Sequence, residues 1–370
     1  MAASGQAAGF LLDPYADWAA AEGVPVHTGF GFDLTALETG DWPRLGARGA
    51  LVHLEGRGDF VDCWLVELAP GRQTEPQRHL FEKVCYVIAG RGGTSIEVDG
   101  RSHGFEWGTG SLFALPLNAR YRHFNTSGRE PARLAAVTSL PLVLKAFHNI
   151  DFVFDNPASF ANRVGEEGWF RGEGRLHPVR PGRHQWETNF VPDLRAFELQ
   201  PWDKRGVGSA NIKFVLADGT MHAHLSELAV GTYKKAHRHG PDFHIFPVTG
   251  HGYSLFWREG DADYTRIDWR HGWVYAPPDQ VFHQHFNTAP APSRYLAVAY
   301  GSIRYPFSAD KRGLFGDGVD RSLSMGGRQI EYEDEDPRIR QTFEAALRES
   351  GVEPDARMVE IWTTTAKRAT

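Results

Sequence analysis

The chain of 370 residues contains an internal repeat, and this repeat limits the fold more than any other feature of the sequence. The stretch VELAPGRQTEPQRH at 66–79 aligns with SELAVGTYKKAHRH at 226–239. Further on, WGTGSLFALPLNARYRHFNT at 107–126 aligns with WRHGWVYAPPDQVFHQHFNT at 269–288. Two copies of one unit in a single chain predict two domains of the same fold.

Each copy has the composition of a β-barrel or a β-sandwich. The chain has 40 glycines and 22 prolines, which separate short apolar runs such as FVDCWLVELAPG and RYLAVAYG. Many short strands with turn residues between them are typical of such folds. Helix signals, an aspartate N-cap followed by proline and closed by glycine, bracket 13–23 and 336–351. We therefore predict an all-β fold with short terminal helices.

Charge and hydropathy exclude several classes of partner. The formal net charge is −6 and basic residues form no run, so we expect no nucleic-acid partner. No apolar window approaches the roughly 18–20 residues that a membrane span requires, so we expect no membrane partner. The first residues lack a basic segment followed by an apolar one, which predicts a cytoplasmic protein without a secretory signal.

Histidine, glycine, proline and asparagine in the second copy have a spacing that resembles the two motifs of the cupin superfamily. The matching residues are Gly231, His237 and His239 in the first motif, and Gly272, Pro278, His283 and Asn287 in the second, with Gln280 where a glycine is usual. This resemblance implies two tandem cupin barrels, which are double-stranded jelly rolls. The division that it implies is an N-terminal arm with a short helix at 1–55, a first barrel at 56–150, a connector at 151–205, a second barrel at 206–305 and a C-terminal extension with a helix at 306–370.

Two histidine pairs of the second copy are spaced for one face of a strand. His237 and His239 are two residues apart, as are His283 and His285, and alternate residues of a strand point to the same side. Neutral imidazoles gathered inside a barrel lose their hydration, which bonds to a divalent metal ion replace. We therefore predict His237, His239 and His283 as metal ligands.

The fourth ligand position falls on the residues that follow the first motif. His244 has the spacing that the resemblance allows for a glutamate ligand, so we predict His244 as a fourth metal ligand. The alternative places Phe243 there and leaves three protein ligands. We predict that His285 and His224 act in catalysis, beside the ligands or on the substrate; hydrogen-bonded structural histidines are the alternative. No residue indicates a further cofactor.

The first copy has lost this histidine set. Gln77 stands in place of the first histidine, Lys83 at the acidic ligand position and Tyr121 in place of His283. A lysine ammonium beside a cation is unfavourable, which predicts a first barrel without metal and one metal ion per chain.

An all-imidazole site suits Fe(II), which we predict, as well as Zn, Ni or Cu, and Mn is not excluded. In length and two-barrel layout the chain resembles metal-dependent dioxygenases of the gentisate 1,2-dioxygenase type. This resemblance implies a non-haem iron dioxygenase that cleaves a small oxygenated substrate, aromatic or diketone-like, with O2, and a homo-oligomeric assembly. The alternatives are a Zn- or Ni-dependent isomerase, lyase or hydrolase, and a ligand-binding or accessory protein without enzymatic activity.

Overall fold

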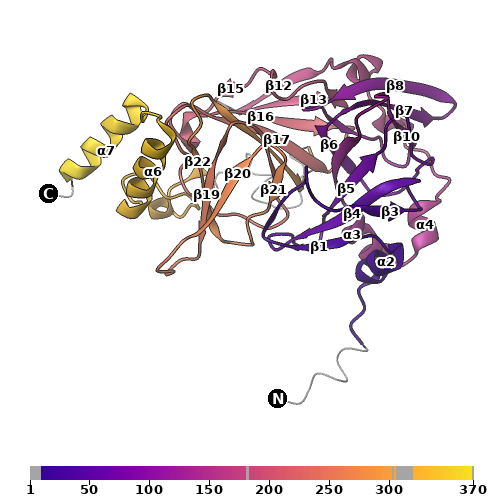
Figure 1. The fold of residues 1–370 in the computed structure, drawn as a ribbon, viewed down its shortest axis with the longest axis horizontal. Helices are drawn as coiled ribbons and strands as arrows, with labels where there is room; N and C mark the ends of the chain where they lie inside the picture. Colours follow the sequence, from indigo (N-terminus) through magenta and orange to yellow (C-terminus); the bar gives the residue numbers. More distant parts are fainter. Residues whose placement is uncertain (1–9, 181–182, 302–303, 306–319, 369–370) are drawn as a thin grey trace.

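The computed structural model consists mainly of β-strands, arranged as two barrels side by side (Figure 1). It describes residues 10–180, 183–301, 304–305 and 320–368. The first half of the chain, drawn in indigo and purple, forms one barrel, and the orange segments belong to the other. The predicted all-β fold with short terminal helices is confirmed.

The first barrel has a large and a small sheet. The large sheet runs in the order β1 (Val26–Gly29), β4 (Ala47–Leu54), β5 (Asp62–Leu68), β11 (Ala132–Thr138), β6 (Lys83–Ala89), β9 (Leu112–Ala114) and β14 (Phe190–Val191), with β3 (Gly40–Trp42) paired to β4. The small sheet runs in the order β10 (Arg120–Asn125), β7 (Arg91–Val98) and β8 (Arg101–Gly108).

The second barrel repeats this plan. Its large sheet runs in the order β12 (Arg175–Arg180), β13 (Arg183–Thr188), β16 (Ala210–Leu216), β17 (Met221–Leu228), β23 (Ser293–Tyr300), β18 (His244–Thr249), β21 (Trp273–Tyr275) and β2 (Gly31–Asp33), with β15 (Gln200–Pro201) paired to β16. The small sheet runs in the order β20 (Thr265–Arg270), β19 (His251–Trp257) and β22 (Phe282–Asn287).

Each barrel receives an edge strand from the other half of the chain. β2 pairs antiparallel with β21 of the second barrel, and β14 pairs antiparallel with β9 of the first. The two crossing segments, FGFDLTALE at 30–38 and FVPDLRAFE at 190–198, are themselves copies of the repeat. The predicted arm and connector therefore contribute strands to the sheets, and the repeat begins earlier than the two motifs indicate.

The helices lie in three parts of the sequence: before the first barrel, between the two barrels, and after the second barrel. They are α2 (Pro14–Glu22), α3 (Leu140–Phe147), α4 (Ile150–Phe154), α6 (Pro337–Ser350) and α7 (Ala356–Arg368), with short 3₁₀ turns at Ala161–Arg163, Glu167–Arg171, Asp203–Arg205 and Leu323–Met325. The predicted caps form: Asp13 accepts hydrogen bonds from the first turn of α2, and Asp336 does so for α6. Among the described residues, none of the helices combines the length and the apolar character needed to cross a bilayer.

The large sheets of the two barrels bury a common apolar core between them. Phe214 and Val298 from the second half pack there with Val84 and Tyr86 from the first half. A separate cluster fills the interior of the second barrel, with Ile245, Phe256, Tyr275 and Tyr295 among its members. Side chains of β18 therefore divide between two environments, the core between the barrels and the interior of the second barrel.

Candidate metal centre

His237 and His283 are held side by side by backbone pairing. The N–H of His237 donates to the carbonyl of His283 at 3.1 Å, and the N–H of His283 donates back at 2.9 Å. This reciprocal pair joins the loop between β17 and β18 to the start of β22. His239 follows two residues after His237, so its ring returns to the same side.

The three histidines predicted as ligands come together. One ring nitrogen from each of His237, His239 and His283 lies within 4.8 Å of the other two. The ring centroids are 4.2 Å apart for His237 and His283, and 4.6 Å apart for His239 and His283. Within the described part of the chain, this is the single group of three or more His, Cys, Asp or Glu side chains placed to hold a metal ion.

Backbone carbonyls fix the tautomer of two of these rings. His239 Nδ1 donates to the carbonyl of Gly240 at 2.7 Å, and His283 Nδ1 donates to the carbonyl of Val281 at 3.2 Å. A proton on Nδ1 places the lone pair of the ring on Nε2, which is the arrangement of a metal-binding imidazole.

Burial also keeps the rings of His237 and His283 neutral. It lowers the pKa of His237 and His283 well below 6.5, and neighbouring histidines and Arg205 lower both values further. Metal binding requires the unprotonated ring, so the site is ready for a cation at neutral pH. Three neutral nitrogens without a carboxylate suit Fe(II), Zn, Ni or Cu, and three protein ligands leave coordination positions open.

His244, predicted as a fourth ligand, lies outside this group. The strand alternates, and the ring of Phe243 takes the place beside His239, with the two centroids 4.2 Å apart. His244 has the same phase as Phe246, which packs in the core between the barrels. Its side chain is 0% exposed and its Nδ1 donates to the carbonyl of Asp242 at 3.2 Å. The structure therefore fits the alternative in which Phe243 takes the fourth position and three histidines are the protein ligands.

His285 lies next to the three histidines without joining them. Its ring centroid is 5.5 Å from that of His283, and its Nδ1 is 2.7 Å from Ser254 Oγ. Trp269 Nε1 also donates to Ser254 Oγ, at 3.0 Å. The first barrel contains the same frame, formed by His123, Thr94 and Trp107.

His224, the other residue predicted to act in catalysis, lies on β17 and is partly buried. Its ring centroid is 6.1 Å from Phe243 and 6.2 Å from Tyr295. Its Nδ1 is buried and has no hydrogen-bond partner. Both His285 and His224 therefore line the interior that the three clustered histidines face.

In the first barrel, hydrogen bonds occupy the positions equivalent to the metal ligands. His79, the counterpart of His239, is 3.0 Å through Nε2 from the hydroxyl of Tyr121. Lys83 donates to the same hydroxyl at 3.2 Å, from the position that Phe243 has in the second barrel. The amino group of Lys83 is therefore a basic group of the protein at the position equivalent to the metal centre.

Sequence reasoning missed Lys234, whose side chain enters the second barrel. The N–H of Lys234 donates to the carbonyl of His285, and the N–H of His237 to that of His283. Between these two hydrogen bonds one strand advances by three residues, from Lys234 to His237, while the other advances by only two, from His285 to His283. This is the geometry of a β-bulge. Simple alternation places Lys235 inside with His237; the bulge places Lys234 there instead. The equivalent bonds of Thr74 and Gln77 in the first copy show the same bulge.

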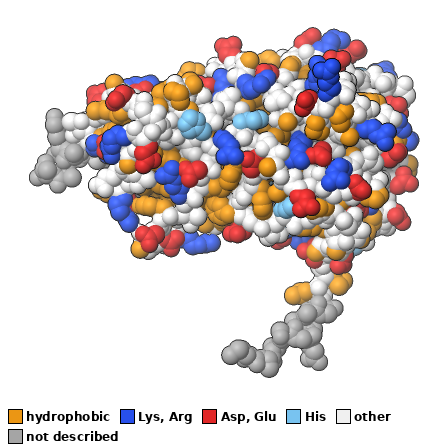
Figure 2. All heavy atoms as spheres, viewed as in Figure 1, with side chains coloured by type: hydrophobic (Ala, Val, Ile, Leu, Met, Phe, Trp, Pro, Cys, Tyr) orange, Lys and Arg blue, Asp and Glu red, His pale blue; other side chains and the backbone are white. Residues whose placement is uncertain are grey.

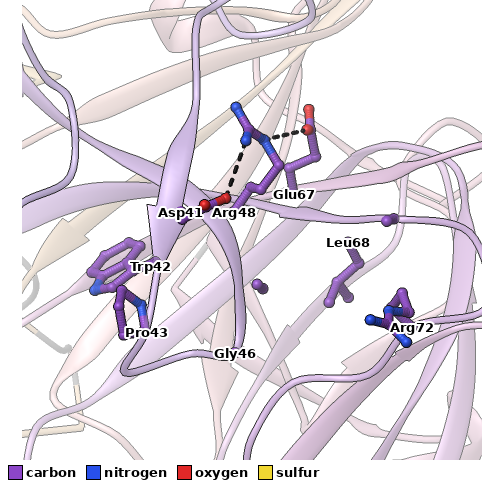
Figure 3. Close-up of a pocket in the computed structure, with 10 residues that line it drawn as sticks. Asp41, Trp42, Pro43, Gly46, Arg48, Glu67, Leu68 and Arg72 are labelled. Atoms are coloured by element: carbon purple, nitrogen blue, oxygen red, sulfur yellow. Dashed lines mark hydrogen bonds and ion pairs between the residues drawn. The ribbon is translucent and has the colours of Figure 1, made fainter.

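The outer surface of the first barrel has a cleft of about 320 Å³ that contains none of the predicted site residues (Figure 3). Its Arg48 is paired with Asp41 at 3.2 Å and with Glu67 at 3.5 Å. On the face shown in Figure 2, acidic and basic side chains of the described residues are interspersed. The clustered histidines therefore remain the candidate site.

Comparisons with known proteins relate the chain to three groups. The sequence model of a family described as auxin binding protein matches residues 45–162. A 1-hydroxy-2-naphthoate 1,2-dioxygenase of Nocardioides sp. strain KP7 is 29% identical over 102 residues, which cover 28% of this chain and 24% of the relative. The match thus spans about a quarter of that enzyme.

Solved structures of oxalate decarboxylases also superpose on the chain. For the Bacillus subtilis protein the TM-score is 0.47 with 16% identity, over 74% of this chain and 77% of that chain. For the Lactobacillus farciminis protein, solved as a formate complex, the TM-score is 0.49 with 14% identity, over 80% and 95%.

Proposed function

We propose that the chain is a two-barrel member of the cupin superfamily and a non-haem Fe(II) dioxygenase acting on a small oxygenated substrate of aromatic or diketone type. The observation that carries the proposal is the convergence of His237, His239 and His283 without a carboxylate. Three imidazoles leave room on one metal ion for both a chelating substrate and O2.

In this proposal His237, His239 and His283 hold the ion, and His244 does not. A bound Fe(II) ion supplies electron exchange between an oxygenated substrate and O2. The protein contributes a dry surrounding, because Phe243 and Phe256 pack against the ligand rings, with centroids 4.2 Å from His239 and 6.4 Å from His283. Exclusion of water protects reactive species and strengthens the electrostatic interactions of the site.

His285 has a separate role in the proposal. Its Nδ1 is engaged with Ser254, so Nε2 is the atom that can donate a proton to the substrate or accept one from it. Since the His285 frame recurs around His123 in the other barrel, the frame itself serves the fold, and the proposed catalytic role belongs to Nε2 alone. His224 is proposed as a further polar contact for the substrate.

The sequence similarity to a naphthoate dioxygenase supports an aromatic substrate and O2. The same three imidazoles also suit zinc and nickel, which favours a metal-dependent lyase, isomerase or hydrolase as the second candidate. A cytoplasmic homo-oligomer remains part of the proposal, and light scattering of the purified protein measures its assembly.

The test is metal analysis of protein purified without a chelating resin, followed by anaerobic loading with Fe(II), Zn, Ni or Mn. Oxygen uptake is then measured with hydroxybenzoates, hydroxynaphthoates, catechols and β-diketones. We expect uptake with one of these substrates only in the Fe(II) form, its loss in His283→Ala and its retention in Tyr121→Phe, the repeat-equivalent control. Stoichiometric zinc and turnover without O2 would replace the dioxygenase by the second candidate.

A further inference from the structure

The interior of the second barrel contains two buried basic side chains, Lys234 and Arg205, with hydrogen-bond donors that no acidic group uses. Lys234 is 1% exposed, and its Nζ donates to the hydroxyl of Tyr295 at 3.0 Å. Among the described residues, no carboxylate forms an ion pair with Lys234. Arg205 is 4% exposed; its Nη2 donates to Asp320 at 2.8 Å, while its buried Nη1 has no partner.

These basic side chains adjoin the candidate metal centre. The backbone N–H of Lys234 donates to the carbonyl of His285, whose ring centroid is 4.9 Å from that of Tyr295. Burial lowers the pKa of Lys234 and of His237, and the positive charge of Arg205 lowers both further. Arg205 is also tied to this strand by its backbone, because its carbonyl accepts from the N–H of Lys235, next to Lys234, at 2.8 Å.

The basic groups of this region are suited to an anion. Arg205 and Arg183 share the carboxylate of Asp320, each at 2.8 Å. Burial favours the neutral amine of Lys234, because it lowers the pKa of this side chain well below 10.5. A bound anion would offset this cost and favour the charged ammonium.

The repeat provides an internal comparison. The counterpart of Lys234 in the first barrel is Thr74, whose Oγ1 accepts a hydrogen bond from the backbone of His123. The same bulge and the same strand pairing thus form without a lysine. The fold does not require Lys234, and the lysine occurs in the barrel that has the histidine cluster.

We propose that Lys234 and Arg205 form a subsite for a carboxylate group of the substrate, beside the metal centre. A carboxylate has two oxygens, which can accept from the free hydrogens of the Lys234 ammonium and from Nη1 of Arg205. The inference rests on the proposed function of the metal centre and narrows its substrate class to small organic acids.

The experiment uses the zinc-loaded protein, in which binding is measured without turnover. The probes are benzoate and its neutral analogue benzamide, titrated by calorimetry. Wild type is expected to prefer benzoate, and Lys234→Met is expected to weaken benzoate binding about 10- to 100-fold while leaving benzamide unchanged, because hydrogen bonds to charged groups have this strength. Lys235→Met is the matched control: it removes the same charge one residue away, where the ammonium pairs with Glu331 at 2.5 Å, and it should bind as wild type does.

Three results would overturn the subsite: equal binding of the two probes by wild type, unchanged benzoate affinity in Lys234→Met, and loss of zinc from that variant. Met has a similar volume and no charge to desolvate, so an unfolding temperature at or above that of wild type is expected. A second variant, Arg205→Lys, keeps the charge beside Asp320 and removes Nη1; benzoate affinity unchanged in it would also contradict the assignment. Oxygen uptake is measured separately, so benzoate binding through Lys234 without O2 chemistry would leave the subsite standing and remove the dioxygenase.

Discussion

Replacing His283 by alanine tests the candidate metal centre most directly, because the repeat supplies its control. His283 and Tyr121 occupy equivalent positions, each in reciprocal backbone pairing with the first residue of the motif, His237 or Gln77. His283→Ala removes one of three metal ligands. Tyr121→Phe removes only the hydroxyl that Lys83 donates to.

The expected loss of metal affinity follows from the number of ligands. Structural zinc sites with four ligands bind with about 10–16 kcal/mol, or about 3–4 kcal/mol for each ligand. A change of about 1.4 kcal/mol is tenfold in affinity, so His283→Ala should weaken metal binding about 100- to 1,000-fold. Tyr121→Phe should leave the affinity unchanged and lower the free energy of unfolding by about 1–3 kcal/mol, because it leaves a buried donor, Lys83 Nζ, and a buried acceptor, His79 Nε2, without this partner.

The assay is competition against a chromophoric chelator, with zinc or Co(II) as the ion, together with thermal unfolding in the presence and absence of metal. Wild type and Tyr121→Phe should bind one ion per chain and gain stability from it, since a ligand that binds only the folded state stabilises it. His283→Ala should show neither effect. Wild-type affinity in His283→Ala, or equal loss of metal from both variants, would refute the assignment.

Three further predictions concern other positions. Copying the second site into the first barrel with Gln77→His, Lys83→Phe and Tyr121→His should create a second metal equivalent, and a stoichiometry still at one ion would show that the frames differ in more than these residues. Burial lowers the pKa of His244 to about 4, so its contribution to stability is complete above pH 6.5 and is lost as the pH falls from 6.5 toward 4. In urea unfolding, His244→Gln should therefore reduce the pH dependence by about 1.4 kcal/mol per pH unit in this window, and an unchanged slope would contradict it. His285→Gln should keep the metal and lower turnover about 10- to 100-fold, whereas unchanged turnover in steady-state kinetics would assign His285 to the fold alone.

The fold and the three clustered histidines were predictable because both rest on local regularities. The repeat marks two similar barrels, and the two-residue spacing of His237 and His239 places them on one face because no irregularity separates them in an extended segment. The crossing strands were not predicted, although FGFDLTALE and FVPDLRAFE are visible copies. Their partners lie in the other barrel, and such pairing leaves no local signal in either segment.

The orientation of His244 and the inward side chain of Lys234 were not predicted, and both depend on the phase of a strand after an irregularity. Asp242 has φ 74°, in the left-handed region, two residues before the first residue of β18, and the phase that follows turns Phe243 inward and His244 toward the other barrel. The bulge between Lys234 and His237 shifts the phase in the same way. A change of one residue reverses the face of every side chain beyond it, so counting alone cannot follow a strand across such a point.

The two barrels show how few residues separate a metal centre from a structural core. In the first barrel Lys83, Tyr121 and His79 form a hydrogen-bonded chain at the equivalent positions, and Lys83 also lies 4.9 Å from the centroid of Trp64. This chain engages His79 Nε2, the atom that a metal would need, and sets an ammonium in its vicinity. In the second barrel an aromatic ring, Phe243, occupies the position of Lys83 and lies beside the ring of His239. The basic group that Lys83 provides at this point in the first barrel is replaced, as we propose, by a bound ion in the second. An ion could enter the first barrel only by displacing Lys83.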